Sequence, residues 1–364
     1  MRVGILGSGQ LGRMLALAAH PLGHDVFVLG DGAGDPAMAV ARGTVASLGD
    51  VATVERFASS VEVVTFEFEN VPAAALAAAA RVTQAWPPVR ALEIGSDRFL
   101  EKTMFTSLGI ATAPFRAVDE EASLSRAALE IGLPAVLKTR RLGYDGKGQK
   151  VLRAPSDVAG AHAELGGVPC VLEAFVAFSR ELSVIAARDV RGAVAAYPLV
   201  VNVARNGILH VTRAPAPDVD AALARRATEI VRVILDHLGY VGVLAVELFQ
   251  VGEDLVANEI APRVHNTGHW TTEGAETSQF EQHVRAVTGA PLGATSLRGV
   301  SAMVNLVGTL PDPSDVLAIP GAHLHVYGKT PRPGRKLGHV TLTGLPPHEL
   351  EAAIARVCAL PGAR

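Results

Sequence analysis

A predicted β-hairpin constrains the fold of this chain most, because it places two glutamates side by side. Two apolar runs, 243–250 and 255–260, flank a Gly-Glu-Asp sequence at 252–254 that favours a turn. If the hairpin folds symmetrically about the middle of this turn, Glu247 lies opposite Glu259. Their Cβ atoms would then be about 5 Å apart. The hairpin therefore predicts a close carboxylate pair.

Such a pair favours a metal ion. Two carboxylates at this distance repel by roughly 3 kcal/mol at an effective dielectric near 20. Mg²⁺ at nucleotide sites is usually held by one or two carboxylates together with phosphate oxygens. The alternative is a surface hairpin whose glutamates face water. We favour the metal site, because four apolar residues should share the face of the glutamates, namely Ala245, Phe249, Leu255 and Ala257.

The loop after the hairpin gathers groups that bind anions or carry protons. It contains Pro262, Arg263, His265, Asn266, Gly268, His269 and Trp270. Such a concentration is unusual for a plain connection and indicates a functional loop.

Length and composition narrow the class of protein. The 364 residues predict two or three domains, and 49% of them are hydrophobic, which is enough for real cores. The net charge of −3 and the lack of a basic block argue against a nucleic-acid partner. No apolar run approaches the length of a membrane span or of a signal peptide, so we expect a cytoplasmic protein with no membrane partner. Cys170 and Cys358 are interpreted as buried thiols.

The N-terminus predicts a βαβ unit. A strand at 2–6 leads into a G-x-G-x-x-G turn at 7–12, which a helix at 13–20 and a second strand at 25–29 follow. Such a turn directs backbone N–H groups at an anion. Asp31 lies near the position of a ribose-binding acid, so an NAD-binding domain is one interpretation.

Acidic residues follow the next predicted strand, at 61–66. The sequence there is Glu67-Phe68-Glu69-Asn70. Acids at the carboxyl end of a strand near the glycine turn predict a ligand crevice, and an ordinary polar loop is the alternative.

A second glycine-rich segment lies in the middle of the chain. Ser96 is predicted to cap a helix at 97–108 that carries Arg98 and Lys102, and a strand at 135–139 contains Lys138. The basic loop that follows, 140–149, has three glycines and can curl over phosphate. It does not have the spacing of a P-loop. A flexible hairpin tip is the alternative.

The last third contains a further basic segment. A long helix at 218–238 precedes the hairpin, and three short strands and a helix at 347–358 follow it. Between these strands, residues 329–339 are basic and contain two prolines. This segment is either a solvated run of charge or an anion contact, and its glycines beside Arg335 and Lys336 favour the contact.

Six motifs, in this order, resemble those of the ATP-grasp superfamily and, within it, the N5-carboxyaminoimidazole ribonucleotide synthetases of purine biosynthesis. They are G-S-G-Q-L-G-R at 7–13, F-E-F-E-N at 66–70, S-D-R at 96–98, G-Y-D-G-K-G-Q at 143–149, N-E-I-A-P-R-V-H-N-T-G-H-W at 258–270 and G-R-K-L-G-H at 334–339. The likeness spans nearly the whole chain. It implies a fold of the α/β and α+β class, the ATP-grasp fold. The expected parts are a Rossmann-like N-terminal domain at 1–95, a central subdomain with a glycine-rich lid at 96–175, a catalytic subdomain with the metal-binding hairpin at 176–295 and a small C-terminal subdomain at 296–364.

The resemblance also implies a set of site residues. ATP would contact Arg98, Lys138, Gly143, Tyr144, Asp145, Gly146, Lys147, Gly148, Gln149, Glu173, Ala174, Phe175, Val176, Glu181, Asn258 and Glu259. Two Mg²⁺ ions would be held by Glu247 and Glu259. By similarity with glycinamide ribonucleotide transformylase, the ribonucleotide would contact Gln10, Leu11, Glu67, Asn266, Lys329, Arg335 and Lys336. Two positions depart from the family pattern: Leu142 replaces a usual glycine and Ala204 an expected histidine. Asn266 fits the carboxylating family, whereas the transformylase typically has aspartate there.

The implied reaction is a carboxylation. Bicarbonate would attack the γ-phosphate of ATP, and the resulting carboxyphosphate would supply CO₂ or a carboxyl group to aminoimidazole ribonucleotide. Arg263 and His265 are assigned to the bicarbonate end, and Asp145 and Lys336 to proton handling or substrate holding. The resemblance further implies a homodimer. Three alternatives stay open: a formate-dependent transformylase, an NAD-dependent dehydrogenase and a nucleotide-sensing module without turnover.

Overall fold

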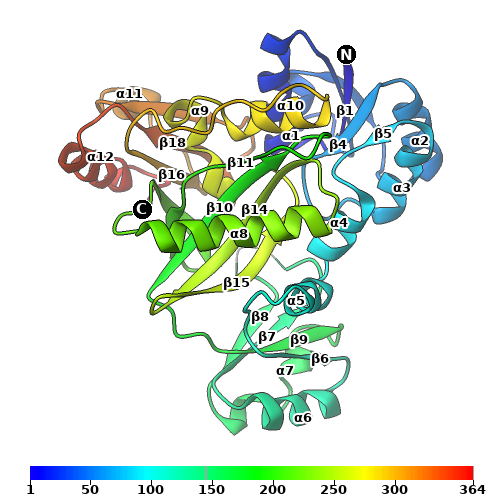
Figure 1. The fold of residues 1–364 in the computed structure, drawn as a ribbon, viewed down its shortest axis with the longest axis vertical. Helices are drawn as coiled ribbons and strands as arrows, with labels where there is room; N and C mark the ends of the chain where they lie inside the picture. Colours follow the sequence, from blue (N-terminus) through cyan, green and yellow to red (C-terminus); the bar gives the residue numbers. More distant parts are fainter. Residues whose placement is uncertain (144–145, 364) are drawn as a thin grey trace.

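The structure, a computed structural model, describes residues 1–143 and 146–363 (Figure 1). Its N-terminal part is a parallel sheet in the order β3-β2-β1-β4-β5. The strands are β1 (Arg2–Leu6), β2 (Asp25–Gly30), β3 (Arg42–Val45), β4 (Val63–Phe66) and β5 (Gln84–Ala85), and the helices are α1 (Gln10–Ala19), α2 (Val51–Ser59), α3 (Ala73–Val82) and α4 (Val89–Gly95). The order reverses between β1 and β4, the position at which open α/β sheets form a crevice. The glycine turn follows β1 and the acidic residues follow β4, as the sequence predicts.

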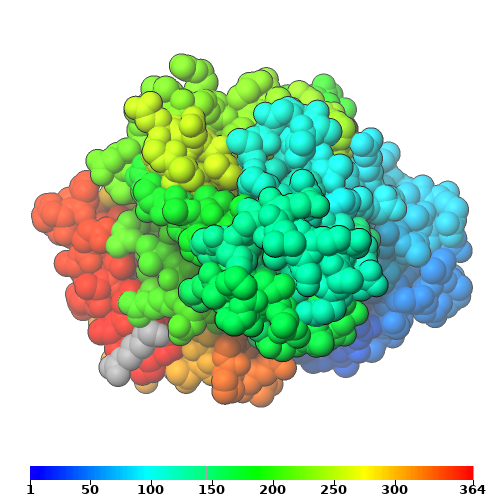
Figure 2. Space-filling model, turned by 90° about the horizontal axis from the view of Figure 1, so that it is seen from below, coloured from blue at the N-terminus to red at the C-terminus, as the bar shows by residue number. Residues whose placement is uncertain are grey.

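A small antiparallel sheet forms the next part, in the order β6-β9-β7-β8. It comprises β6 (Phe115–Val118), β7 (Ala135–Thr139), β8 (Gln149–Leu152) and β9 (Cys170–Ala174), with α6 (Glu121–Ile131) and α7 (Ala161–Glu164); α5 (Arg98–Ser107) precedes it. Leu124 of α6 packs on Leu137 and Leu172 of the sheet, and all three are fully buried. In Figure 2 this part lies in front of the larger body, with the N-terminal residues in blue and the C-terminal residues in red on opposite sides.

The largest sheet runs in the order β15-β14-β10-β12-β13-β16-β18-β17, with β11 beside β10. Its strands are β10 (Arg180–Arg188), β11 (Val194–Ala196), β12 (Val200–Arg205), β13 (Ile208–Ala214), β14 (Gly242–Val251), β15 (Asp254–Ala261), β16 (Ser301–Val307), β17 (Ala322–Val326) and β18 (Lys336–Leu342). Its helices are α8 (Ala221–His237), α9 (Thr271–Gly274), α10 (Gln279–Val287), α11 (Pro313–Leu317) and α12 (Pro347–Ala359). One face is covered by α8, while α10 contacts α1 of the N-terminal part on the other (Figure 1). The hairpin and the C-terminal strands therefore belong to one sheet.

The predicted glutamate pair forms, but the hairpin is not symmetric. Glu247 pairs with Glu259, as expected, whereas nearer the turn Leu248 pairs with Ala257, so that Asn258 is an extra residue in β15. This bulge reverses the facing of the β15 residues between it and the turn, whereas Phe249 on β14 keeps the face of Glu247. The prediction that Ala257 and Leu255 share the face of the glutamates is therefore wrong, because both pack with Leu248 in the opposite core.

Two helices begin differently from the prediction: α5 has a different capping residue, and α1 starts earlier in the chain. Asp97, not Ser96, caps α5, since its carboxylate accepts hydrogen bonds from the N–H groups of Phe99 and Leu100. Ser96 instead ends α4. Within the glycine turn, α1 starts at Gln10, three residues earlier than predicted.

Among residues 1–143 and 146–363, no helix is both long enough and apolar enough to cross a membrane.

Candidate active site

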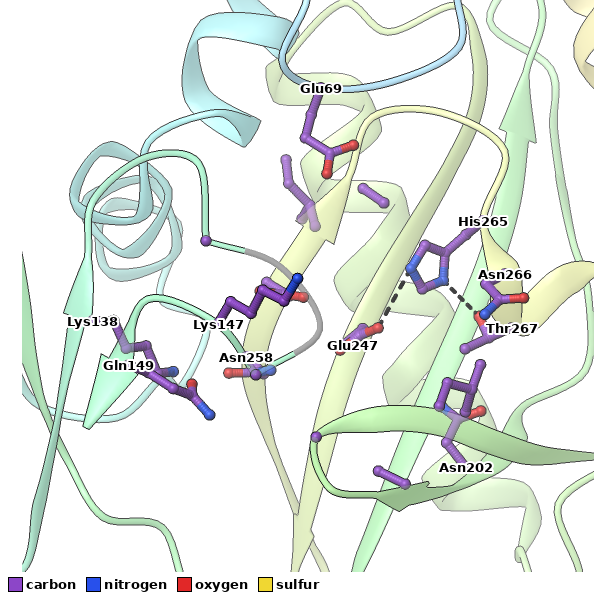
Figure 3. Close-up of a pocket in the computed structure, with 18 of the residues that line it drawn as sticks. Glu69, Lys138, Lys147, Gln149, Asn202, Glu247, Asn258, His265, Asn266 and Thr267 are labelled. Atoms are coloured by element: carbon purple, nitrogen blue, oxygen red, sulfur yellow. Dashed lines mark hydrogen bonds and ion pairs between the residues drawn. The ribbon is translucent and has the colours of Figure 1, made fainter. Parts of the chain in front are cut away.

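A cavity of about 1000 Å³ is lined by residues from the small and the large sheet, from the segments that follow β1 and β4, and from the segment between β17 and β18. Figure 3 shows Lys138 and Gln149 of the small sheet on one side, and Glu247 and His265 on the other. The site residues proposed from the sequence line this cavity, apart from Glu67 and Gly148. Tyr144 and Asp145 lie outside the described residues. The structure thus gathers residues that are up to 326 positions apart in the chain, from Gln10 to Lys336.

Three glutamates and an asparagine define what we call the acidic end of the cavity: Glu181, Glu247, Asn258 and Glu259. Burial, Glu259 and Glu181 together raise the pKa of Glu247 to about 8. Burial also acts on Glu259, but the Arg98 guanidinium, 2.6 Å from its carboxylate, lowers the pKa of that group. The amide oxygen of Asn258 is buried without a hydrogen-bond partner among the described residues. These oxygen donors suit a hard cation.

Helix α5 holds the strand that carries Glu259. Arg98 binds the Glu259 side chain, and the next turn of the helix contacts the backbone on both sides of it. Lys102 Nζ donates to the Asn258 carbonyl at 2.8 Å, and Glu101 accepts from the Ile260 N–H at 2.5 Å. The sequence predicts Lys102 on this helix without indicating a role for it, and no motif marks Glu101. Their spacing from Arg98, three and four residues, is the signal that puts all three on one helix face.

Glu173 joins α5 to the small sheet. Its carboxylate lies 2.9 Å from Lys138 Nζ and 3.3 Å from Lys102 Nζ, and it is almost completely buried. Burial acts to raise its pKa, but the two ammonium groups lower it. Lys138 therefore has a carboxylate partner in this structure, besides any phosphate that it would contact.

The glycine-rich loop is anchored at its start. Asp97 accepts two hydrogen bonds from Arg140, at 2.8 and 3.0 Å, and one from Arg141 at 3.2 Å. Gly148 has a φ of 70°, and a Cβ atom there would lie 2.6 Å from the Thr139 hydroxyl. Glycine is therefore required where the loop returns to β8.

The two residues that depart from the family pattern, Leu142 and Ala204, both line the cavity. Leu142 has a φ of 64°, in the left-handed region that favours glycine, and its side chain is 72% exposed. Ala204 on β12 lines the cavity with a methyl group in place of the expected imidazole. A nearby apolar wall was not predicted: Phe178 stacks on Phe249 with ring centroids 4.4 Å apart.

Arg263 forms a half-buried ion pair with Glu69, one of the acids after β4. Burial opposes ionisation of Glu69, yet Arg263 lowers its pKa to about 2. Arg263 also donates to the Val264 carbonyl at 3.0 Å. The guanidinium is thus oriented by protein groups while still lining the cavity.

His265 lies between the acidic end and a short 3₁₀ turn, η4 (Asn266–Gly268). Its Nε2 is 3.5 Å from Glu247, and its Nδ1 is 2.8 Å from the Thr267 hydroxyl (Figure 3). Burial and the nearby Arg263 lower its pKa to about 3, so the ring is neutral near pH 7. Gln279, which no sequence motif marks, holds the backbone of His265 with its side-chain amide: the oxygen accepts from the His265 N–H at 2.9 Å, and the NH₂ donates to the His265 carbonyl at 2.7 Å.

Lys329, Arg335 and Lys336 form what we call the basic end of the cavity. Burial, followed by repulsion from Arg335, lowers the pKa of Lys329 to about 8. Arg335 donates to the Thr330 carbonyl at 3.1 Å, which orders the segment locally. Converging cations of this kind suit a phosphate group.

Asn266 lines the cavity next to His265 and is half-buried. Both polar atoms of its side chain are buried and have no hydrogen-bond partner within the described residues (Figure 3). Buried amides are normally paired, so this amide has capacity for a ligand.

The N-terminal glycine turn contributes Gln10 and Leu11 to the cavity lining. Glu67 is instead buried behind the turn, where its carboxylate accepts from the N–H groups of Gly9 and Gly12. Asp31, the expected ribose-binding acid of a dinucleotide fold, is exposed and does not line the cavity.

The fold and this site define an ATP-grasp protein. Residues 103–280 match the ATP-grasp domain, residues 1–96 the ribonucleotide synthetase preATP-grasp domain, and residues 301–353 the phosphoribosylaminoimidazole carboxylase C-terminal domain.

Comparisons of the whole chain with known proteins identify the family within the ATP-grasp proteins. N5-carboxyaminoimidazole ribonucleotide synthase of Pseudomonas aeruginosa is 50% identical over 360 residues, which are 99% of both chains. A crystal structure of the synthetase from Thermus thermophilus is 49% identical, with a TM-score of 0.95 over 99% of this chain and 98% of that one. The synthase of Aspergillus clavatus, in complex with ADP and 5-aminoimidazole ribonucleotide, is 32% identical, with a TM-score of 0.92 over 98% and 97% of the two chains. This chain belongs to the N5-carboxyaminoimidazole ribonucleotide synthase family, which confirms the resemblance drawn from its motifs.

Proposed function

We propose that this protein carboxylates 5-aminoimidazole ribonucleotide with bicarbonate and ATP, releasing ADP and phosphate, as a step of purine biosynthesis. One observation carries the proposal: a single cavity joins the acidic end and the glycine-rich loop to the basic end. A nucleotide and a phosphorylated substrate can therefore occupy one site. Family membership adds support, because the relatives bear the name of this synthase.

ATP would lie between the small sheet and the acidic end. The segment Glu173–Val176 and the stacked pair Phe178 and Phe249 offer an apolar wall for the adenine. Lys138, Arg98 and the glycine-rich loop would neutralise phosphate charge.

Mg²⁺ fits the acidic end. The described residues contain no group of three or more His, Cys, Asp or Glu side chains arranged for a metal, so protein ligands alone would not complete its shell. Glu247 and Glu259 with phosphate oxygens would do so, for up to two ions. When bound, Mg²⁺ would supply charge neutralisation at the transferring phosphoryl group.

The carboxyl-transfer end would lie at Arg263 and His265. A bicarbonate or carboxyphosphate anion would meet the Arg263 guanidinium, which Glu69 orients. Neutral His265 can form a hydrogen bond through the ring nitrogen that faces Glu247, and so orient a bound anion or the Glu247 carboxyl group. Lys336 and Asp145 are the further candidates for holding substrate or moving protons.

The ribonucleotide would bind between the glycine turn and the basic end. Its phosphate would meet Lys329, Arg335 and Lys336, while Asn266 would bind a polar group of the base or ribose. Gln10 and Leu11 would close the opposite side. We also expect a cytoplasmic homodimer, which light scattering at micromolar concentration would test.

An ADP-release assay tests the function. Release should require aminoimidazole ribonucleotide and bicarbonate, and glycinamide ribonucleotide with formate should not replace them. Release with the second pair alone would assign the transformylase activity instead. No substrate-dependent release would favour a nucleotide-sensing module, and micromolar NAD binding would revive the dehydrogenase interpretation.

A further inference from the structure

One side chain crowds all three glycines of the G-x-G-x-x-G turn. A Cβ atom would lie 2.5 Å from Glu67 Cγ at Gly7, 2.7 Å from a Glu67 carboxylate oxygen at Gly9, and 3.2 Å from the other oxygen at Gly12. Contacts this short exclude a side chain at the first two positions. In a dinucleotide fold these glycines admit a pyrophosphate, whereas here they make room for an internal carboxylate.

Glu67 occupies the place of an anion in hydrogen bonding as well. Its carboxylate oxygens accept from the Gly9 N–H and, at 2.6 Å, from the Gly12 N–H. Gly9 is the cap of α1 and has no side chain to offer, so the first N–H groups of this helix depend on Glu67. The side chain is 5% exposed and reaches the turn from the end of β4.

Nearby charge favours a carboxylate at this position. Burial raises the pKa of Glu67, while the two N–H donors and the more distant Lys329 and Arg263 oppose that rise. The positive end of the α1 dipole acts in the same direction as these cations.

We infer that Glu67 is a built-in anion: it fills the phosphate position of the glycine turn, which excludes dinucleotides, and it positions Gln10 and Leu11 at the cavity. The first role is independent of the substrate. The second rests on the proposed function, because it assumes that the ribonucleotide meets the turn. Glu67 is thus a positioning residue that acts through the backbone.

Chemical rescue tests the first role. Glu67→Ala should unfold at a lower temperature than the wild type, and acetate at tens of millimolar should raise its melting temperature by about 2 °C or more, because a ligand that binds only the folded state stabilises it. Acetate should leave unchanged the wild type and Glu93→Ala, which removes an exposed glutamate from the same domain. An equal response of all three proteins, or none, would overturn the inference.

A second variant decides the matter if Glu67→Ala does not fold. Glu67→Gln keeps the volume but replaces one acceptor oxygen by an NH₂ group that faces an N–H donor. It should raise the KM for aminoimidazole ribonucleotide about tenfold, the effect of one lost hydrogen bond to a charged group, while kcat changes less. Wild-type melting and KM would overturn the inference. Such a result would leave the proposed function standing, since that rests on the activity of the wild-type protein.

Discussion

Burial and like-charged neighbours disfavour the charged form of a side chain at both ends of the cavity, with carboxylates at the acidic end and ammonium groups at the basic end. At the acidic end, burial and neighbouring carboxylates raise the pKa of Glu247, whereas at the basic end burial and neighbouring cations lower that of Lys329. Each end favours the neutral form of its own group until a ligand of opposite charge arrives.

The two ends differ in how they are built. Glu247 and Glu259 lie on paired strands and α5 holds their geometry, whereas Lys329 and Arg335 lie in the segment between β17 and β18. The cation site is therefore preorganised by regular structure, and the anion site is carried by a loop beside it.

The largest expected effect comes from neutralising one carboxylate of the acidic end. Glu259→Gln keeps the shape of the side chain but leaves a single charge, so we expect Mg²⁺-dependent turnover to fall roughly 100-fold or more, as when a group that stabilises transition-state charge is lost. The fold should persist, because glutamine has nearly the same volume and its amide oxygen can still accept a hydrogen bond from Arg98. ADP release measured against Mg²⁺ concentration checks this. Glu253→Gln, at the exposed turn of the same hairpin, is the matched control, and wild-type turnover in both variants would contradict the metal assignment.

Removing charge from the basic end should have the next largest effect. Replacing both Arg335 and Lys336 by alanine should weaken ribonucleotide binding on the order of 100-fold or more, because charge-assisted phosphate contacts contribute about 1.5–3 kcal/mol each. ATP binding should be largely unchanged. Calorimetry with each ligand distinguishes the two ends, and the exposed Arg298→Ala is the control. Equal loss of both ligands would mean that the ends are not separate.

A smaller effect should follow from loosening the support of the acidic end. Lys102→Met removes the hydrogen bond to the Asn258 carbonyl and one partner of Glu173, so we expect the KM for ATP to rise about tenfold with a lesser change in kcat. Steady-state kinetics measures both. Lys150→Met, which breaks an ion pair with Glu164 at the edge of the small sheet, should change neither. A fall in kcat alone would assign Lys102 to chemistry.

The smallest effect concerns pH at the basic end. With its pKa lowered to about 8, Lys329 is protonated below pH 8 and binds phosphate fully; above that pH, binding must take up a proton. Affinity for the ribonucleotide should thus be constant below pH 8 and fall by up to about tenfold per pH unit above it. Calorimetry from pH 7 to 9.5 would show this decline. Lys329→Arg should remove it, because arginine stays charged throughout.

The sequence predicted local structure and the residue types of the site well. The hairpin, the glutamate pair and most of the lining residues follow from strand alternation, turn chemistry and family motifs. The bulge at Asn258 does not, because one extra residue leaves the pattern of the sequence almost unchanged while it reverses the faces beyond it.

The sequence assigned no role to two charged residues of α5. Glu101 and Lys102 have the composition of a solvated face, and only the packing of α5 against β15 shows that they are buried. The contact between Glu67 and the ribonucleotide stays a prediction, but the hydrogen bonds from the glycine turn to the Glu67 carboxylate were not predicted. Its two bonds to the turn depend on how far β4 extends towards α1, a distance that no local pattern encodes.

Because the large sheet is continuous, its C-terminal strands cannot be exchanged independently of the strands that carry the glutamate pair. Residues 211–214 of β13 pair with 301–304 of β16, so the strands of the last third extend the same hydrogen-bonded ladder that begins at the glutamate hairpin. A chain cut before β16 would leave the edge of β13 unpaired and open to association with other strands. A C-terminal region grafted from a relative would have to keep this register to retain the spacing between the two ends. The last third is therefore a fixed part of the scaffold and not an interchangeable appendage.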